Sequence, residues 1–491
     1  MYIGASAVTG TGLVVKYNPM TGAVTLNQTI PLSAGTLYAD PFVLSTQTIN
    51  ATAGQYRLIN WTLQGLGTNF TASIMSNITY PFASVGTADY ESMISVSSYS
   101  ASPASTGVAS IVYLAAASLT TGQLLWNESS GVGYPIFSGL TGVADHGMYA
   151  QRFDDGHWYC WNLHTGALAW TSQYSSIPWG TFGAYAQQSA YGLIFYNQYD
   201  GIVAYNWTNG QVAWHFTSSS IPFETPYTNG TGNLNGEGYS FFSDGIVADG
   251  KLYTYSVEHS PTAPLARGWS TYCINATTGA LIWQTLGPMI PGVVSDGYLT
   301  ATNYYDGFMY IFGKGLSSTT VSAPQTAIAT GTPIVISGTV LDQSPAQPGT
   351  PAVSDAIMGD WMAYLHQQAP CPANVTGVPV SIDAVDPNGN SVHIGVATSN
   401  IQGTFGYTWT PTIAGQYTIT ATFAGDESYG SSSAGTYASV ISPTATSTPT
   451  TTAAPSNLAT TTDVMTYVVV VGIAIIIAIA IVGALILRKK A

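Results

Sequence analysis

Charged residues are scarce in this chain, and cations are scarcer still. Only 7% of its 491 residues are charged, against about 25% in an average soluble globular domain. Nine lysines and arginines stand against 23 acidic residues, too few to build the basic patch that phosphate contacts need. Nucleic acid is therefore excluded as a main partner. A coiled coil and a helix-rich cytosolic enzyme are excluded as well, because both are rich in charged helix formers.

Motifs for common enzyme chemistries are also missing. The seven histidines show no spacing typical of metal ligands, and no Gly-x-Ser-x-Gly, Walker or His-Glu-x-x-His motif is present. Asp145, His146, Asp154, Asp155 and His157 form an acidic cluster that could hold a metal ion. An Asp-Asp-Gly sequence is typical of a hairpin turn, however, so we predict a turn there. We predict no catalytic, cofactor-binding or metal-binding residues.

The chain nevertheless contains enough hydrophobic and aromatic residues to form a folded core. Hydrophobic residues make up 46% of it and aromatic residues 12%, which excludes wholesale disorder. Its 52 glycines and 26 prolines favour many turns between short strands. The composition therefore predicts an uncharged, β-rich, extracellular protein with more than one domain.

One uncharged apolar run lies near the C-terminus, at residues 464–487. A helix of that length spans about 36 Å, enough to cross a hydrocarbon core of about 30 Å. Arg488, Lys489 and Lys490 follow as a stop-transfer signal at the start of the tail 488–491. By the positive-inside rule, these cations stay cytoplasmic and the N-terminal part faces outside. The prediction is a single-pass protein of the cell membrane that contacts lipid through residues 464–487.

Two segments before this helix bear on how the protein is displayed. Residues 442–463 are mostly Ser, Thr, Pro and Ala, which predicts an extended stalk above the membrane. The first residues lack the basic and apolar regions of a signal peptide, although residues 14–26 already resemble a strand from mid-domain. We therefore expect a signal-less fragment that is truncated at its N-terminus.

A repeat occupies the first 316 residues. Its unit is Asn, then a Thr-Gly or Asn-Gly turn, then an apolar residue and Trp two positions apart, as in Asn162 to Trp170. The pairs of turn glycine and Trp are Gly122 with Trp126, Gly166 with Trp170, Gly210 with Trp214, and Gly279 with Trp283. Gly22 begins a copy with Leu26 in the Trp place, and Asn60 to Gly65 is interpreted as a degenerate copy. The period is about 44 residues, which favours a four-stranded propeller blade.

The aromatic strand, the Asn-x-x-Thr-Gly turn and the Leu-x-Trp strand resemble the repeats of PQQ-like, or quinoprotein-type, β-propellers. About seven blades fit residues 1–316, and six to eight are compatible with them. The resemblance implies that Trp126, Trp170, Trp214 and Trp283 dock between neighbouring blades. It also raises PQQ with Ca²⁺ as a cofactor. Quinoprotein dehydrogenases have an adjacent cysteine pair that this chain lacks, and no cofactor is predicted.

The three cysteines are interpreted through the same repeat. Cys160 and Cys273 each lie two residues before a repeat Asn, so they occupy equivalent places in blades that are not adjacent. A disulfide between them is therefore not expected, and both are interpreted as small buried apolar residues. Cys371 has no partner that the sequence identifies in its own domain.

Ten Asn-x-Ser/Thr sequons are candidates for N-glycosylation, as on an extracellular glycoprotein. About half are expected to be used. Asn206 and Asn275 are also repeat asparagines that can bond their own turns, whereas Asn69 and Asn77 are predicted to be more exposed. The full set is Asn27, Asn50, Asn60, Asn69, Asn77, Asn127, Asn206, Asn229, Asn275 and Asn374.

A second domain is predicted at residues 317–441. Alternating β-branched residues such as 335–340 and 417–423 replace the Gly-Trp repeat and resemble prokaryotic immunoglobulin-like sandwiches. Residues 353–369 are predicted to form a short inserted helix. Its apolar stripe is expected to pack against the sandwich, with a grip on a partner as the alternative. The stripe comprises Met358, Trp361, Met362 and Leu365.

These predictions combine into one organisation and one function. The fold class is all-β, with a propeller, an immunoglobulin-like sandwich and a single transmembrane helix. The function is a cell-surface scaffold for binding, adhesion or a surface layer, without catalysis, whose partner is a surface protein or a glycan. Two alternatives remain: an extracellular PQQ-dependent dehydrogenase, and a polysaccharide hydrolase with two carboxylates across a cleft.

Overall fold

The fold is known from a computed structural model. The elements of the fold are nearly all strands, and the structure describes most of the chain. It describes residues 2–443 and 461–488, apart from residues 9–10, 19–20, 33–34, 68, 101–110, 134–141, 154, 174–186, 199–200, 219–240, 242–244, 258–269, 288 and 305.

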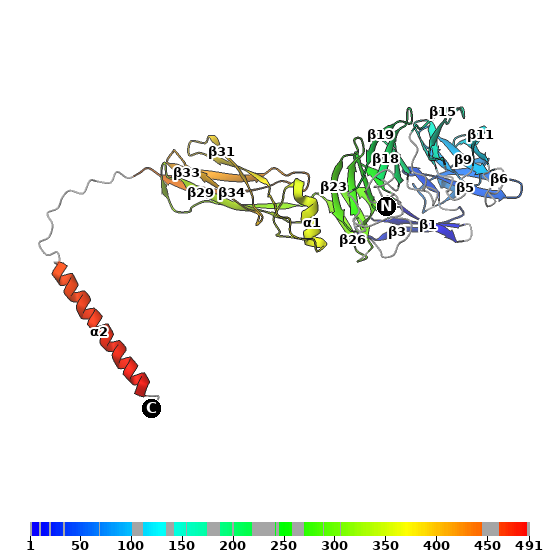
Figure 1. Ribbon diagram of the computed structural model, residues 1–491. Coiled ribbons are helices and arrows are strands. Elements are labelled where there is room, and N and C mark those ends of the chain that lie inside the picture. Colours follow the sequence, from blue (N-terminus) through cyan, green and yellow to red (C-terminus); the bar gives the residue numbers. More distant parts are fainter. Residues whose placement is uncertain are drawn as a thin grey trace.

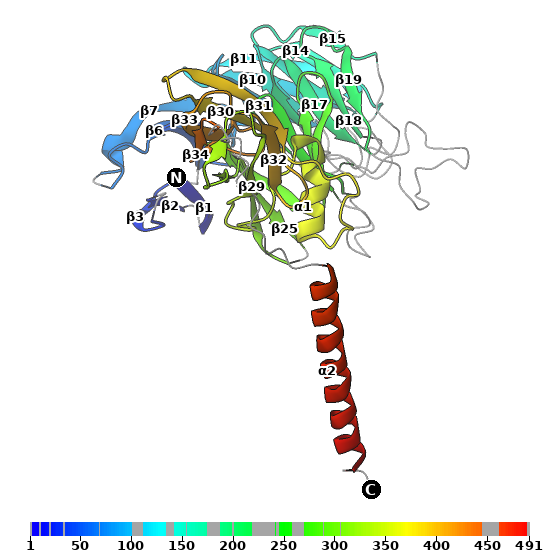
Figure 2. The same cartoon turned by 90° about the vertical axis from the view of Figure 1, so that its left-hand side faces the viewer.

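Seven small antiparallel sheets, here called sheets 1 to 7 in chain order, are arranged side by side in the N-terminal part of the described chain (Figures 1 and 2). Sheets 2 to 6 have four strands, and sheets 1 and 7 have three. Sheets 1 to 3 comprise β1 (Tyr2–Val8), β2 (Thr11–Tyr17), β3 (Val24–Ile30); β4 (Thr36–Ala39), β5 (Phe42–Asn50), β6 (Gln55–Thr62), β7 (Ile74–Tyr80); and β8 (Thr87–Asp89), β9 (Ile94–Ser100), β10 (Ile111–Ser118), β11 (Leu124–Gly133). A 3₁₀ turn, η1 (Thr71–Ser73), precedes β7.

Sheets 4 to 7 continue the same pattern along the chain. Their strands are β12 (Gly142–Asp145), β13 (Met148–Arg152), β14 (Trp158–Asn162), β15 (Leu168–Thr171); β16 (Gln187–Ala190), β17 (Leu193–Gln198), β18 (Gly201–Asn206), β19 (Val212–Phe216); β20 (Ile246–Ala248), β21 (Lys251–Tyr255), β22 (Ser270–Asn275), β23 (Leu281–Leu286); and β24 (Met289–Ser295), β25 (Tyr298–Asn303), β26 (Met309–Gly313). The first strands of neighbouring sheets contact each other, as β12 contacts both β8 and β16. First strands therefore lie at the centre and last strands at the rim, which is the β-propeller architecture predicted from the repeat.

Two-residue hairpins join the first and second strands of sheets 4 to 7. His146-Gly147, Tyr191-Gly192 and Asp249-Gly250 all have positive φ at both residues. That backbone belongs to the type I′ turn, whose twist matches the twist of the strands on either side. The short connection keeps each first strand in register at the centre.

Apolar side chains fill the space between neighbouring sheets. Between sheets 4 and 5, for example, Trp158 of β14 packs against Tyr196 and Tyr205, and all three are buried. Similar clusters join sheets 1 and 2, 2 and 3, 3 and 4, and 5 and 6. The core of the propeller is therefore a series of separate layers, each formed by two sheets.

A two-sheet sandwich follows the propeller (Figure 1). Eighteen buried residues form a single cluster between the sheets, which includes Ile336, Val380 and Ile419. One sheet has the order β27 (Ser317–Ser322), β29 (Ile334–Asp342), β32 (Thr404–Trp409); the other has β28 (Ile328–Ala329), β34 (Ser432–Ile441), β33 (Gly415–Phe423), β30 (Pro379–Val385), β31 (Ser391–Thr398).

The short helix α1 (Met358–His366), which follows the 3₁₀ turn η2 (Asp355–Ile357), joins the sandwich to the propeller. Trp361 is buried, and Met358 packs against the sandwich core. The other side of α1 contacts β23 of sheet 6, where a Cβ on Gly359 would lie only 2.7 Å from the carbonyl oxygen of Gln284. The predicted packing on the sandwich is thus only part of what the helix does.

A second helix, α2 (Thr461–Arg488), lies at the C-terminal end. Its segment Thr461–Leu485 is long enough and apolar enough to cross a membrane, and none of it is buried against the rest of the described chain. Lys489 and Lys490 of the predicted stop-transfer signal, and most of the predicted stalk, lie outside the described residues.

Candidate functional site

The repeat tryptophans tie neighbouring sheets together. The indole Nε1 of Trp126 donates to the carbonyl of Leu163 in the next sheet, at 2.6 Å. Trp170 donates in the same way to Trp207 at 2.8 Å, and Trp214 donates to Ala276 at 3.0 Å. Each acceptor directly follows the repeat Asn of the next sheet. The indoles therefore bond the turn that comes one repeat later.

The turn glycines make room for these rings. Gly166 has a φ of +74°, and a Cβ there would lie 2.9 Å from the ring of Trp126. Gly279 has a φ of +73°, and a Cβ there would lie 2.7 Å from the ring of Trp214. Gly210 lies under Trp170 in the same way. A left-handed backbone and a covering ring both favour glycine at this position.

The copies at either end of the repeat differ. Leu26 pairs with Lys16 on the preceding strand, just as each repeat Trp pairs with a residue on the strand before it. The side chain of Leu26 contacts Gly67. Gly122 faces the carbonyl of Thr79 instead of a Trp, and Gly22 has no atom near its missing Cβ among the described residues. Trp283 stacks on Phe312 of sheet 7 with ring centroids 5.6 Å apart.

The copy assigned to Asn60–Gly65 is shifted in the structure. Trp61 pairs with Ile74 and Asn60 pairs with Ser76, which places Thr62 where other copies have Asn. The turn before β7 is longer than in the other copies and contains η1. The prediction placed the copy in the right hairpin but in the wrong register, because the turn carries an insertion.

Both repeat cysteines are free and fully buried, at equivalent places in sheets 4 and 6. Cys160 pairs with Trp170, and Cys273 pairs with Trp283. Burial raises the pKa of both thiols, to about 12 for Cys273. They are therefore protonated at neutral pH and do not act as nucleophiles. Cys371 is free and exposed.

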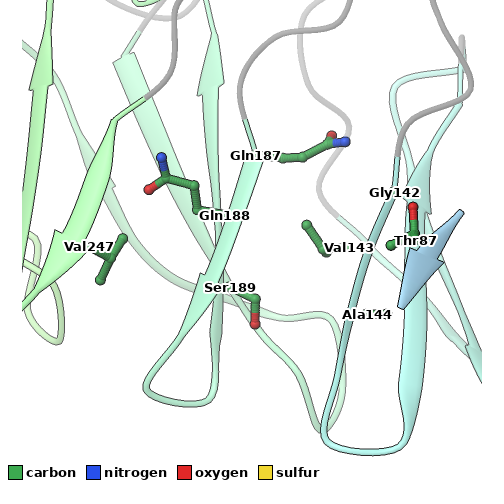
Figure 3. Close-up of a pocket in the computed structure, with 8 residues that line it drawn as sticks. All are labelled: Thr87, Gly142, Val143, Ala144, Gln187, Gln188, Ser189 and Val247. Atoms are coloured by element: carbon green, nitrogen blue, oxygen red, sulfur yellow. The ribbon is translucent and has the colours of Figure 1, made fainter. Parts of the chain in front are cut away.

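Four of the inner strands line an open pocket of about 400 Å³, here called the cavity (Figure 3). Gln187 extends from β16 toward β12, and Gln188 points the opposite way, toward β20. The eight residues come from four sheets and include no acid, base, histidine or cysteine. They are Thr87, Gly142, Val143, Ala144, Gln187, Gln188, Ser189 and Val247. The cavity therefore offers amide and hydroxyl groups on an otherwise apolar wall.

Ser189 is held in place at one end of this cavity. Its Oγ accepts a hydrogen bond from Trp207 Nε1 at 2.7 Å and donates one to Asp145 Oδ2 at 2.5 Å. His146 lies on the other side of the carboxylate, with Nδ1 3.0 Å from Asp145 Oδ1. A serine nucleophile needs a histidine next to its hydroxyl, but here the carboxylate lies between them. The arrangement positions Ser189 and does not activate it.

Three carboxylates lie together beside the turns at this end, on Asp89, Glu91 and Asp145. Their oxygens are within 4.8 Å of one another, and they are the sole group of metal-binding spacing among the residues that the structure describes. Asp89 accepts hydrogen bonds from Ser92 Oγ at 2.6 Å and from the Gly147 amide at 2.9 Å. Burial opposes its ionisation, but these bonds outweigh burial and lower its pKa. Asp89 thus links the turns of sheets 3 and 4.

The acidic cluster considered in the sequence is divided by the fold. Asp145 and His146 lie at one end of β13, whereas Asp155 and His157 lie in the turn at its other end. Asp155 accepts from the His157 amide at 3.0 Å and from Tyr159 Oη at 2.7 Å, as expected of a hairpin turn. Asp154 lies outside the described residues.

The eight lining residues do not by themselves supply ligands for the Ca²⁺ that would accompany PQQ. Calcium sites are built from several oxygen ligands that usually include carboxylates, and none of the eight lining residues has one. The carboxylates of Asp89, Glu91 and Asp145 lie nearby, and Asp89 already accepts hydrogen bonds from Glu91, Ser92 and Gly147.

The sequon asparagines differ in accessibility. Asn27, Asn50, Asn69, Asn77, Asn127 and Asn374 are exposed. Asn206 and Asn275 each accept hydrogen bonds from the amides of their own turns, at 2.8 and 2.9–3.0 Å. Asn60 is half-buried and donates to Tyr38 Oη at 2.8 Å. Asn229 lies outside the described residues.

Comparison with known proteins supports the repeat family. Residues 110–259 match the family model described as "Outer membrane protein assembly factor BamB". That segment covers the sheets in which the Asn-turn-Trp unit is most regular. No curated protein matches the sequence.

Among solved structures, the chain is similar to BamB from Moraxella catarrhalis, with 12% identity over 76% of this chain and 94% of that one and a TM-score of 0.32. It is also similar to Sqt1 from Saccharomyces cerevisiae, with 12% identity over 64% and 81% and a TM-score of 0.37. The C-terminal WD40 domain of Sif2 gives 10% identity over 64% and 78%, with a TM-score of 0.35.

Sequence reasoning missed the cavity residues and the carboxylate group. Thr87, Gln187 and Ser189 lie on short inner strands that carry no repeat signature. One signal was available for β16, which immediately precedes the two-residue turn Tyr191-Gly192, so Gln187 and Ser189 could have been assigned to the centre.

Proposed function

We propose that this protein is a membrane-anchored, non-catalytic binding scaffold of the cell surface. In this proposal, residues 1–316 form the propeller, 317–441 an immunoglobulin-like sandwich and 442–463 a stalk. Residues 464–487 span the membrane, and the tail 488–491 is cytoplasmic.

The neutral inner cavity is the observation that supports binding best. Its polar groups are the amides of Gln187 and Gln188 and the hydroxyls of Thr87 and Ser189. Such groups recognise a neutral ligand through hydrogen bonds, and they offer no general acid, base or nucleophile. A segment of a surface protein or a glycan has the matching chemistry.

Display on a membrane agrees with the remaining features. Helix α2 has the length and hydropathy of a single span, and the cations that follow it favour a cytoplasmic C-terminus. Helix α1 contacts both the sandwich core and β23, so it lies between the propeller and the sandwich. A role in binding protein is also what the matching family's description as an assembly factor implies for such a propeller.

Binding by the full-length chain in lipid nanodiscs tests this function. A glycan array and a pull-down from solubilised cell surfaces would each compare the natural chain with a Thr87→Val/Gln187→Ala double variant. We expect the variant to lose at least tenfold in apparent affinity, because two hydrogen-bonding groups leave the cavity. Gln211→Ala, at an exposed residue of the turn before β19, is the matched control and should bind normally. Equal binding by both variants would show that the binding site lies outside the cavity.

A further inference from the structure

Three sequons occupy one and the same place in the repeat. This place, here called the rim position, directly follows the Trp place on the last strand of each sheet. Strand pairing defines it: Asn27 lies opposite Val15, Asn77 opposite Ile59, and Asn127 opposite Ala115. Sheets 1, 2 and 3 therefore present a sequon asparagine at equivalent positions.

Sheets 4 to 6 have other residues at the rim position. Thr171 lies opposite Tyr159, His215 opposite Val203, and Gln284 opposite Tyr272. All three are exposed, as the three asparagines are. The two halves of the rim thus share geometry and differ in chemistry.

The geometry of the rim position suits modification of an asparagine. Because side chains alternate along a strand, a residue after the Trp place points away from the next sheet. Tyr99 Oη donates to Asn127 Oδ1 at 2.8 Å, and Arg57 Nε donates to Asn77 Oδ1 at 2.7 Å. Both bonds use the amide oxygen and leave Nδ2, the atom that a glycan modifies, outside the interaction.

We propose that Asn27, Asn77 and Asn127 carry N-linked oligosaccharides, which cover the rim of sheets 1 to 3 and leave that of sheets 4 to 6 bare. The donor class is an oligosaccharide linked to a polyprenyl phosphate or pyrophosphate. Nδ2 attacks the anomeric carbon, the N–C bond forms as the bond from that carbon to the phosphate oxygen breaks, and Nδ2 loses one proton to the transferase.

The bare half of the rim coincides with the contact between the two folded units. Helix α1 packs on β23, and Gly359 lies against the carbonyl of Gln284, the rim residue of sheet 6. Leu281, Ile282 and Leu286 of β23 are also exposed, so apolar surface remains accessible on this side.

Glycopeptide mass spectrometry of the full-length chain, isolated from membranes of a host with N-glycosylation, tests the inference. We expect high occupancy at the three rim asparagines and none at Asn206 or Asn275, which are half-buried where the exposed rim asparagines are not. His215→Asn creates the sequon Asn-Phe-Thr at the rim position of sheet 5 and should become occupied. Thr79→Val removes the sequon of Asn77 and should abolish occupancy there alone.

The inference rests on the proposed outward display, and the outcomes separate the two. Occupancy at Asn50, Asn69 and Asn374 with empty rim asparagines would overturn the rim assignment and leave outward display intact. Absence of glycan at every sequon would also overturn the rim assignment, and labelling of lysines on intact cells would then decide the display. Occupancy of Asn206 or Asn275 would show that rim geometry does not select the sites.

Discussion

Replacing Trp214 with alanine is expected to cost the propeller about 3–5 kcal/mol of unfolding free energy. The side chain is buried, lies 5.7 Å from Phe195 between ring centroids, and covers Gly279. Its removal also leaves the buried carbonyl of Ala276 without the indole donor. Circular dichroism of the full chain in detergent should show the β-sheet transition at a clearly lower temperature.

Trp283→Ala is the matched control for this prediction. Trp283 occupies the same place in the next sheet but is half-buried, and its ring stacks on Phe312. We expect a smaller loss, because less apolar surface becomes exposed. If the two variants lose equal stability, the indole bond and the deeper burial of Trp214 do not contribute as described.

Gly210→Ala is expected to destabilise the fold through two additive effects. A φ of +69° costs an alanine about 1–2 kcal/mol, and its Cβ would collide with the ring of Trp170. Overpacking of this kind costs about 1–3 kcal/mol more. The midpoint of urea unfolding, measured on the full chain, should therefore fall substantially.

Gly22→Ala separates the two effects. Gly22 has nearly the same φ, +70°, but nothing described lies within 4 Å of its missing Cβ. It should show only the backbone cost, so its midpoint should fall less than that of Gly210→Ala. Equal shifts would mean that the Trp170 ring moves aside and that the turn glycine is required for its backbone alone.

The propeller could be predicted because its signal is local. Asn162, Gly166 and Trp170 fall within nine consecutive residues, and that short stretch specifies a turn and the strand after it. The register of sheet 2 was predicted wrongly because Thr62 and Ser76 occupy the places of the repeat Asn and Trp, and because η1 lengthens the turn. Where the local signal is lost, only the pairing of whole strands fixes the register.

The cavity could not be predicted from local signals. Its residues come from β8, β12, β16 and β20, which are far apart in the chain and meet only when the sheets gather around the centre. Neutral residues such as Thr87 and Gln187 form no recognisable motif either. The contact of α1 with β23 was missed for the same reason, since it joins two separately folded units.

Outward display of the propeller is the central claim, and lysine labelling tests it most directly. Intact cells that express the full chain would be treated with a membrane-impermeant amine reagent, and the modified peptides would be identified by mass spectrometry. Lys16 and Lys314 are exposed, whereas Lys489 and Lys490 follow the membrane helix. The account predicts labelling of Lys16 and Lys314 in intact cells, and of Lys489 and Lys490 only after permeabilisation. The reverse pattern would contradict it.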